Sequence, residues 1–128
     1  MLFRSVDPRI QIEGNPPLLE KLFVSLLSNA ADAMRPEGGE VRILSRLHEG
    51  LALIEVSDDG TGVPHEIQDR LFEPFLSSKG DRGAGLGLLI AREIARQQGG
   101  DLTLRSSSPQ GASFAVSLQV HTGASHLS

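Results

Sequence analysis

The feature that most constrains this chain is a run of alternating glycines, residues 83–87, that leads directly into a helical pattern. Apolar residues recur there with the spacing of one helix face, at Leu86, Leu89, Ile90 and Ile94. Glycines let a backbone approach a ligand closely, and the first turn of a helix offers unpaired N–H groups and the positive end of its dipole. This layout predicts an anion site that suits a polyphosphate.

The composition is that of one soluble globular domain, with 128 residues, 39% hydrophobic and 22% charged. A net charge of −4 with scattered basic residues argues against a nucleic-acid partner. Without cysteine there is no disulfide or thiolate metal site, and the four histidines lack the spacing of zinc ligands.

No apolar run approaches the roughly 20 residues of a membrane-spanning helix, and the start of the chain lacks the apolar core of a signal peptide. We therefore expect a cytoplasmic domain without direct membrane contact, which is a monomer by itself even if its parent protein is membrane-anchored. Residues 1–120 are predicted to form the domain and residues 121–128 a flexible tail.

A long amphipathic helix is predicted from the N-cap Asn15, through two prolines in the first turn, to Met34. Ser25, Asn29 and Asp32 fall in one polar stripe along the edge of its apolar face. The stripe therefore borders the core, where polar side chains can face a ligand.

Alternating and apolar segments predict strands at residues 9–13, 40–47, 51–57, 102–104 and 112–118. Glu49-Gly50 is a plausible hairpin turn, and residues 51–57 are apolar enough for a central strand buried on much of both faces. That strand ends at Asp58-Asp59, which a loop with Gly60 and Gly62 follows. Strands and helices in this arrangement indicate an α+β domain.

Four separated motifs then occur in a recognisable order. Residues 26–33, LLSNAADA, are similar to the N box of histidine kinases, and Asp58-x-Gly60-x-Gly62 to their first glycine box. Residues 72–75, FEPF, resemble the F box, and the glycine run with Leu88 resembles the second glycine box. The chain thus resembles the ATP-binding catalytic domain of sensor histidine kinases, most closely the nitrogen-regulatory type, within the GHKL superfamily. The resemblance implies a Bergerat-type two-layer α+β sandwich, with a mixed sheet of about five strands and about three main helices on one face.

The resemblance assigns roles to the first two motifs. Asn29 is the implied Mg²⁺ ligand. One amide oxygen suffices, because Mg²⁺ keeps several waters and takes few protein oxygens. Asp32 either orders a metal-bound water or the nucleotide network, or is a solvated or structural carboxylate. Asp58 is the implied acceptor of a hydrogen bond from the exocyclic amine of adenine. Guanine carries an oxygen at that position and cannot donate this hydrogen bond. Gly60 belongs to the same box; Gly62 would let the base approach the loop closely, and Val63 would cover the face of the base.

The later motifs are implied to hold the phosphates. Lys79 either reaches the γ-phosphate or is a solvated loop lysine. The phosphate-binding positions implied for the second glycine box are Gly83, Gly85, Leu86, Gly87 and Leu88. Ala84 stands where threonine is usual, which removes a hydroxyl that could bind a phosphate oxygen. Phe72 and Phe75 are interpreted as core anchors.

The implied activity is transfer of the γ-phosphoryl group of Mg-ATP to a histidine on an upstream helical dimerisation domain, for onward transfer to a response regulator. No histidine here has an acceptor context; His65-Glu66 only faintly resembles the acceptor box, without its basic residue and proline. In ATPase relatives a glutamate one turn before the N-box asparagine activates water. Ser25 occupies that position and cannot act as such a base, so hydrolysis should be slow.

Three other interpretations compete with this one. The glycine run does not match the dinucleotide fingerprint GxGxxG, and a polar loop rather than a strand precedes it. A serine kinase of the anti-sigma-factor type shares the fold, but the residue Ser25 and the wording FEPFLSSK argue against it. A non-catalytic nucleotide-sensing module also remains open, and Ala84 is the residue that favours it.

Overall fold

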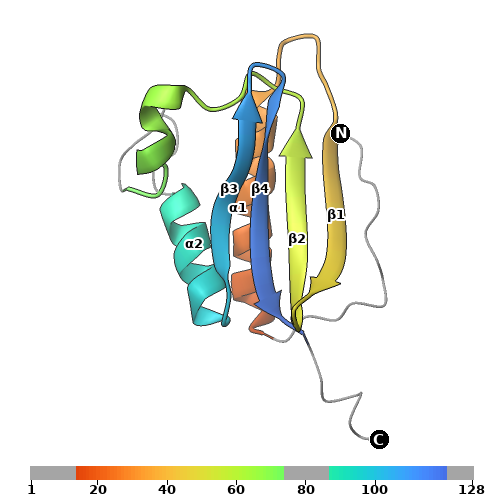
Figure 1. Ribbon diagram of the computed structural model, residues 1–128, viewed down its shortest axis with the longest axis vertical. Helices are drawn as coiled ribbons and strands as arrows, with labels where there is room; N and C mark the ends of the chain where they lie inside the picture. The colour runs from red at the N-terminus through yellow and green to blue at the C-terminus, as the bar shows by residue number, and fades with distance from the viewer. Residues whose placement is uncertain (1–13, 74–86, 121–128) are drawn as a thin grey trace, which may run out of the picture.

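The computed structural model describes residues 14–73 and 87–120, which form two layers (Figure 1). The elements are α1 (Pro16–Ala33), β1 (Val41–His48), β2 (Leu51–Asp58), the 3₁₀ helix η1 (His65–Arg70), α2 (Gly87–Gln97), β3 (Asp101–Ser108) and β4 (Gly111–Gln119). In this part of the chain the sheet has four strands in the order β1-β2-β4-β3. The predicted α+β class is confirmed.

The sheet differs from the prediction in strand number and direction. All three strand pairs in the described residues are antiparallel, whereas a mixed sheet of about five strands was predicted. Two-residue turns join β1 to β2 and β3 to β4, and such turns can join only antiparallel strands. The strand predicted at residues 9–13 lies outside the described residues.

Helix α1 begins and ends as its sequence predicts. The side chain of Asn15 accepts a hydrogen bond from the Leu18 N–H at 3.1 Å, prolines occupy the first turn, and Met34 is the C-cap. Leu22, Leu26 and Ala30, spaced one turn apart, are buried against the sheet. None of the described helices is long and apolar enough to cross a membrane.

The hairpin between β1 and β2 turns at Glu49-Gly50, where both residues have positive φ, 53° and 83°. This is the geometry of a tight type I′ turn. Burial alternates along β2, with Ala52, Ile54, Val56 and Asp58 buried and their neighbours half-buried. The predicted central position of β2 is confirmed, but only one of its faces is buried and the other is half-buried. Figure 1 shows the reason: α1 and α2 lie on the same face of the sheet.

Helix α2 packs beside α1 and over β3 and β4. The core between helices and sheet is apolar, with Leu22, Leu102, Leu118, Val41 and Val116 the largest fully buried side chains. Because α1 and β2 run in the same direction, their carboxyl ends lie at the same end of the molecule (Figure 1). The N-box helix and the carboxylate at the end of β2 thus meet there.

A candidate nucleotide pocket at the carboxyl ends of α1 and β2

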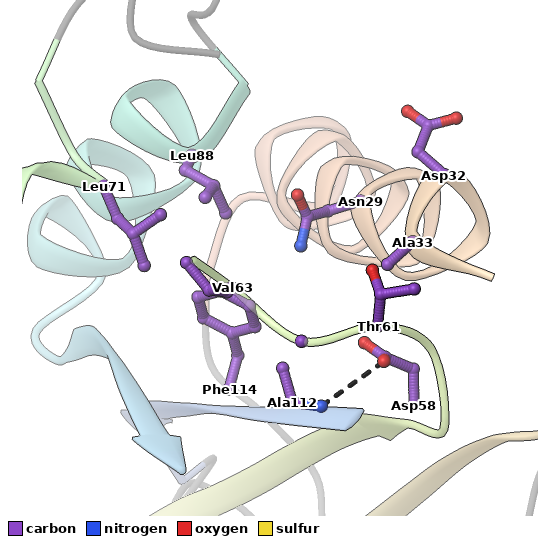
Figure 2. A pocket seen from close by; sticks show the side chains of 11 residues that line it. Asn29, Asp32, Ala33, Asp58, Thr61, Val63, Leu71, Leu88, Ala112 and Phe114 are labelled. Carbon is purple, nitrogen blue, oxygen red and sulfur yellow. Dashed lines mark hydrogen bonds between the residues drawn. The ribbon is translucent and has the colours of Figure 1, made fainter. Parts of the chain in front are cut away.

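A cavity of about 160 Å³ opens where α1, the loop after β2, the start of α2 and the start of β4 come together (Figure 2). Six predicted site residues line it: Asn29, Asp32, Asp58, Gly62, Val63 and Leu88. Residues from separate segments of the chain therefore share one pocket, as the motifs predict.

Asn29 and Asp32 reach the pocket differently, although both belong to the last turns of α1. Asn29 is half-buried, and its amide points toward the other lining side chains in Figure 2. Asp32 is exposed and its carboxylate points away from Asp58, so it lies at the rim. The amide oxygen of Asn29 is a ligand type that suits Mg²⁺, which needs only one or two protein ligands. No cluster of three His, Cys, Asp or Glu occurs in residues 14–73 or 87–120.

Asp58 is the one buried charged side chain among the described residues, with 6% of its surface exposed. Its Oδ1 accepts hydrogen bonds from the N–H groups of Gly60, at 2.9 Å, and Ala112, at 3.3 Å. Oδ2 accepts none from the described part of the chain and is turned toward the interior of the pocket in Figure 2. Burial raises the pKa of Asp58; the two N–H groups lower it and the charge of Asp59 raises it further. The carboxylate is therefore fixed by one oxygen and offers the other.

The two glycines of the first glycine box are needed for backbone packing. A Cβ at Gly60 would lie 2.2 Å from the carbonyl oxygen of Ala33, and Gly60 does not line the pocket. Gly62 has a φ of +80°, and a Cβ there would lie 2.1 Å from the carbonyl oxygen of Ser108. The Val63 N–H donates to Ser107 Oγ at 2.7 Å. The loop thus packs closely against both α1 and β3. This packing places Val63 at the pocket.

Five lining residues were not predicted: Ala33, Thr61, Leu71, Ala112 and Phe114. Ala112 and Phe114 alternate along β4 on the face that packs against the helices. That period-2 pattern, extended to the start of the strand, could have placed both of them near Asp58. No local signal distinguishes Leu71 from an ordinary core residue, since it packs in the core and lines the pocket at once.

The F box is described only in part. Phe72 packs against the core, as predicted for an anchor, and the Arg92 guanidinium lies 4.5 Å from the centre of its ring. Gly87 is the exposed first residue of α2. Phe75, Lys79, Gly83, Ala84, Gly85 and Leu86 lie outside the described residues, as does the predicted tail. Their predicted roles stay predictions.

The fold and the site define a small-ligand-binding α+β domain, whose pocket sets a buried carboxylate and an amide against apolar walls. The chain belongs to the family described as histidine kinase-, DNA gyrase B-, and HSP90-like ATPase, whose model matches residues 14–122. The resemblance inferred from the four motifs is thereby confirmed.

The chain is similar to known sensor histidine kinases in both sequence and structure. The chain is 34% identical over 130 residues to the sensory histidine kinase/phosphatase NtrB of Klebsiella oxytoca, covering 93% of this chain and 37% of NtrB. Its structure superimposes on the mycobacterial sensor histidine kinase MprB with a TM-score of 0.80 at 26% identity, covering 92% of this chain and 82% of that one. Full-length ShkA in complex with AMPPNP gives a TM-score of 0.78 at 26% identity, covering 92% and 25% respectively.

Proposed function

We propose that this chain binds Mg-ATP in the pocket and donates the γ-phosphoryl group to a histidine on a helical dimerisation domain outside the chain, for onward transfer to a response regulator. The observation that carries the proposal is that Asn29 of α1 and Asp58 of β2, which are distant in sequence, line one cavity. The names of NtrB and MprB, both sensor histidine kinases, support it. The AMPPNP complex of ShkA supports a nucleotide as the ligand.

Adenine fits the inner part of the pocket. Asp58 Oδ2 can accept a hydrogen bond from the exocyclic amine of adenine, and guanine has no amine at that position. Val63, Leu71, Leu88 and Phe114 supply apolar walls for the ring. A cavity of about 160 Å³ is smaller than the roughly 300–1,000 Å³ of complete ligand sites. The base would therefore fill it, with the phosphates extending past Asn29 toward the rim.

The chemistry asked of these residues is positioning and charge neutralisation. Phosphoryl transfer involves little covalent work for the protein, and an imidazole is already nucleophilic. Asn29 would hold a Mg²⁺ ion, which neutralises charge on the phosphates when bound. Ser25, one helical turn earlier, does not line the pocket and cannot act as a general base for water. Transfer to a histidine is therefore favoured over hydrolysis.

Asn29→Ala tests the binding half of the proposal. We expect Mg-dependent ATP affinity to fall at least about tenfold, because a ligand to the metal is lost and one such interaction is about 1.5 kcal/mol or more. Calorimetry with and without Mg²⁺ measures this. Ser28→Ala is the matched control, since Ser28 is its exposed neighbour on α1 and does not line the pocket. Equal Mg-ATP affinity in the wild type and Asn29→Ala would remove the role of Asn29.

Phosphoryl transfer is tested by mixing the chain with helical acceptor domains and γ-labelled ATP. Acid-labile phosphohistidine is the expected product. Acid-stable phosphoserine would show instead a serine kinase of the anti-sigma-factor type. ATP binding without transfer to any acceptor domain would indicate a nucleotide-sensing module.

A further inference from the structure

Three segments that are distant in sequence meet where α1 ends, and the side chain of Arg35 joins them. Its Nη1 donates to the carbonyl oxygen of Asp59 at 2.6 Å, and its Nη2 donates to the carbonyl oxygen of Pro109 at 2.5 Å. Asp59 lies in the loop after β2, and Pro109 lies in the turn between β3 and β4. One guanidinium thus ties the end of the N-box helix to two other parts of the chain.

The residues around the Arg35 guanidinium, which forms a fork with its two bound carbonyl groups, are in close contact. The Thr61 N–H donates to the carbonyl oxygen of Ala33 at 3.2 Å, and the Glu40 N–H donates to Asp59 Oδ1 at 2.9 Å. A Cβ added at Gly39 would lie 2.2 Å from Asp59 Oδ1. Asp59 is therefore engaged through both its side chain and its carbonyl. The loop has little freedom to shift against α1.

The fork acts on the two groups that aim Asp58. The carboxylate is held by the N–H of Gly60, next to Asp59, and by the N–H of Ala112, three residues after Pro109. Between them, Gly111 brings the backbone so close to Asp58 that a Cβ would lie 2.0 Å from its carbonyl oxygen. Because Arg35 binds the carbonyl oxygens of Asp59 and Pro109, it links the two segments that carry these donors.

Arg35 does not line the pocket, so it acts through other residues. The arginine guanidinium offers donors on two nitrogens in one rigid plane, which can bind two carbonyl oxygens at once; a lysine ammonium lacks this fixed geometry. Both acceptors are neutral carbonyl groups, so the interaction serves geometry rather than charge pairing.

We propose that Arg35 is a positioning residue for nucleobase selection, which holds the first glycine box and the β3–β4 turn in the register that points Asp58 Oδ2 at the base. The inference rests on the proposed function, because it concerns the selection of adenine in the same pocket. It predicts that Arg35 affects the preference for ATP over GTP, although it touches neither nucleotide.

The test compares Mg-ATP and Mg-GTP affinities by calorimetry in the wild type, Arg35→Ala and Arg35→Lys, with circular dichroism to confirm folding. We expect the ATP-to-GTP affinity ratio to fall about tenfold in Arg35→Ala, the scale of one misaligned hydrogen bond to a charged group. Loss of the positive charge alone would weaken both nucleotides equally and leave the ratio unchanged. Arg35→Lys keeps the charge but not the fork, so its ratio should also fall, by about threefold.

Two further measurements separate positioning from a general loss of stability. Millimolar guanidinium should restore part of the ratio in Arg35→Ala, whereas ethylammonium should not. Arg105→Ala is the matched control: Arg105 pairs with Glu55 at 3.4 Å on the face of the sheet away from the helices, and its removal should leave the ratio unchanged.

Wild-type ratios in both Arg35 variants would overturn the inference and leave the proposed function intact. If Arg35→Ala does not fold, the ratio in Arg35→Lys decides alone. A wild-type chain that binds ATP without preference over GTP would also overturn the inference. A wild-type chain that binds no ATP would instead refute the proposed function.

Discussion

Two aspartates at opposite ends of the sheet are held in contrasting ways. Asp58 ends β2 and Asp101 begins β3, and both strands run antiparallel to β4, so the two residues lie far apart along the same direction (Figure 1). Asp58 is bound by two backbone N–H groups and makes no ion pair within the described residues. Asp101 Oδ1 instead receives hydrogen bonds from Arg92 and Arg96, each at 3.1 Å, and from the Leu102 N–H at 2.8 Å.

The pKa shifts of the two groups have opposite signs. Burial raises the pKa of Asp101 as well, but the hydrogen bonds from Arg92, the Leu102 N–H and Arg96 outweigh it, so the pKa is lowered overall. At Asp58 burial prevails and the pKa is raised. A carboxylate neutralised by arginines stabilises the fold. A buried carboxylate without a cation costs stability but keeps an oxygen for a ligand, as is common at functional sites.

The largest effect is expected from Asp58→Asn. The Gly60 and Ala112 N–H groups require an oxygen at Oδ1, so the new amide NH₂ must face the pocket. It would then oppose the exocyclic amine of adenine, donor against donor, but could donate to the O6 of guanine. We expect ATP affinity to fall about ten- to a hundredfold, or about 1.5–3 kcal/mol, with GTP weakened less. Calorimetry with both nucleotides measures this.

Asp59→Asn provides a matched control, because it removes a charge at the next residue and keeps an acceptor for the Glu40 N–H. Its nucleotide preference should stay that of the wild type. An Asp58→Asn variant that still prefers ATP to the wild-type extent would show that Asp58 does not read the base. The contrast between Asp58 as a ligand-binding aspartate and Asp101 as a structural aspartate would then be wrong.

A smaller effect of the same substitution is expected on the stability of the ligand-free chain. Because the folded-state pKa of Asp58 lies above the ordinary 3.8, the folded chain binds this proton more tightly than the unfolded chain. The stability that the proton contributes is fully present below the ordinary pKa and is lost as the pH rises through the raised one. The amide that replaces the carboxylate in the variant cannot ionise. We expect Asp58→Asn to melt at a higher temperature than the wild type at pH 7.

The melting-temperature gap should close as the pH falls toward 4, because Asp58 of the wild type then becomes neutral too. Thermal unfolding followed by circular dichroism at several pH values measures the gap, and the titration of all other groups is common to both proteins. A variant less stable than the wild type at neutral pH would mean that the two N–H groups outweigh burial.

The sequence predicted those parts of the fold that depend on local chemistry. The cap at Asn15, the turn at Glu49-Gly50 and the helix of the N box were all correct, since capping, positive φ and amphipathic periodicity act over a few residues. The predicted burial of β2 was correct for one face only, because an apolar strand does not reveal how many of its faces another layer covers.

The candidate site was predictable through its motifs but not through its supports. Asn29 and Asp58 carry the recognisable chemistry, so the motifs bring them to notice. Leu71 and Arg35 do not, because their roles depend on which distant segments lie beside them. Arg35 in particular binds the carbonyl oxygens of Asp59 and Pro109. Every residue carries a backbone carbonyl, so the sequence does not indicate which ones accept such a hydrogen bond.

The smallest effect is expected from Asp101→Asn, and its sign should be opposite to that of Asp58→Asn. The stability from the lowered pKa of Asp101 is present above the ordinary value and lost as the pH falls through the folded one. Asn keeps an acceptor for the Leu102 N–H but loses the charge that two arginines pair with. The side chain of Asp101 is 40% exposed, so we expect a loss of no more than about 1 kcal/mol at pH 7. Urea unfolding measures it, and ATP affinity should not change.

Glu73→Gln is the control: its ion pair with Arg70 is more exposed, so its loss should reduce stability less. If Asp101→Asn instead weakened ATP binding as Asp58→Asn does, the two ends of the sheet would share one function.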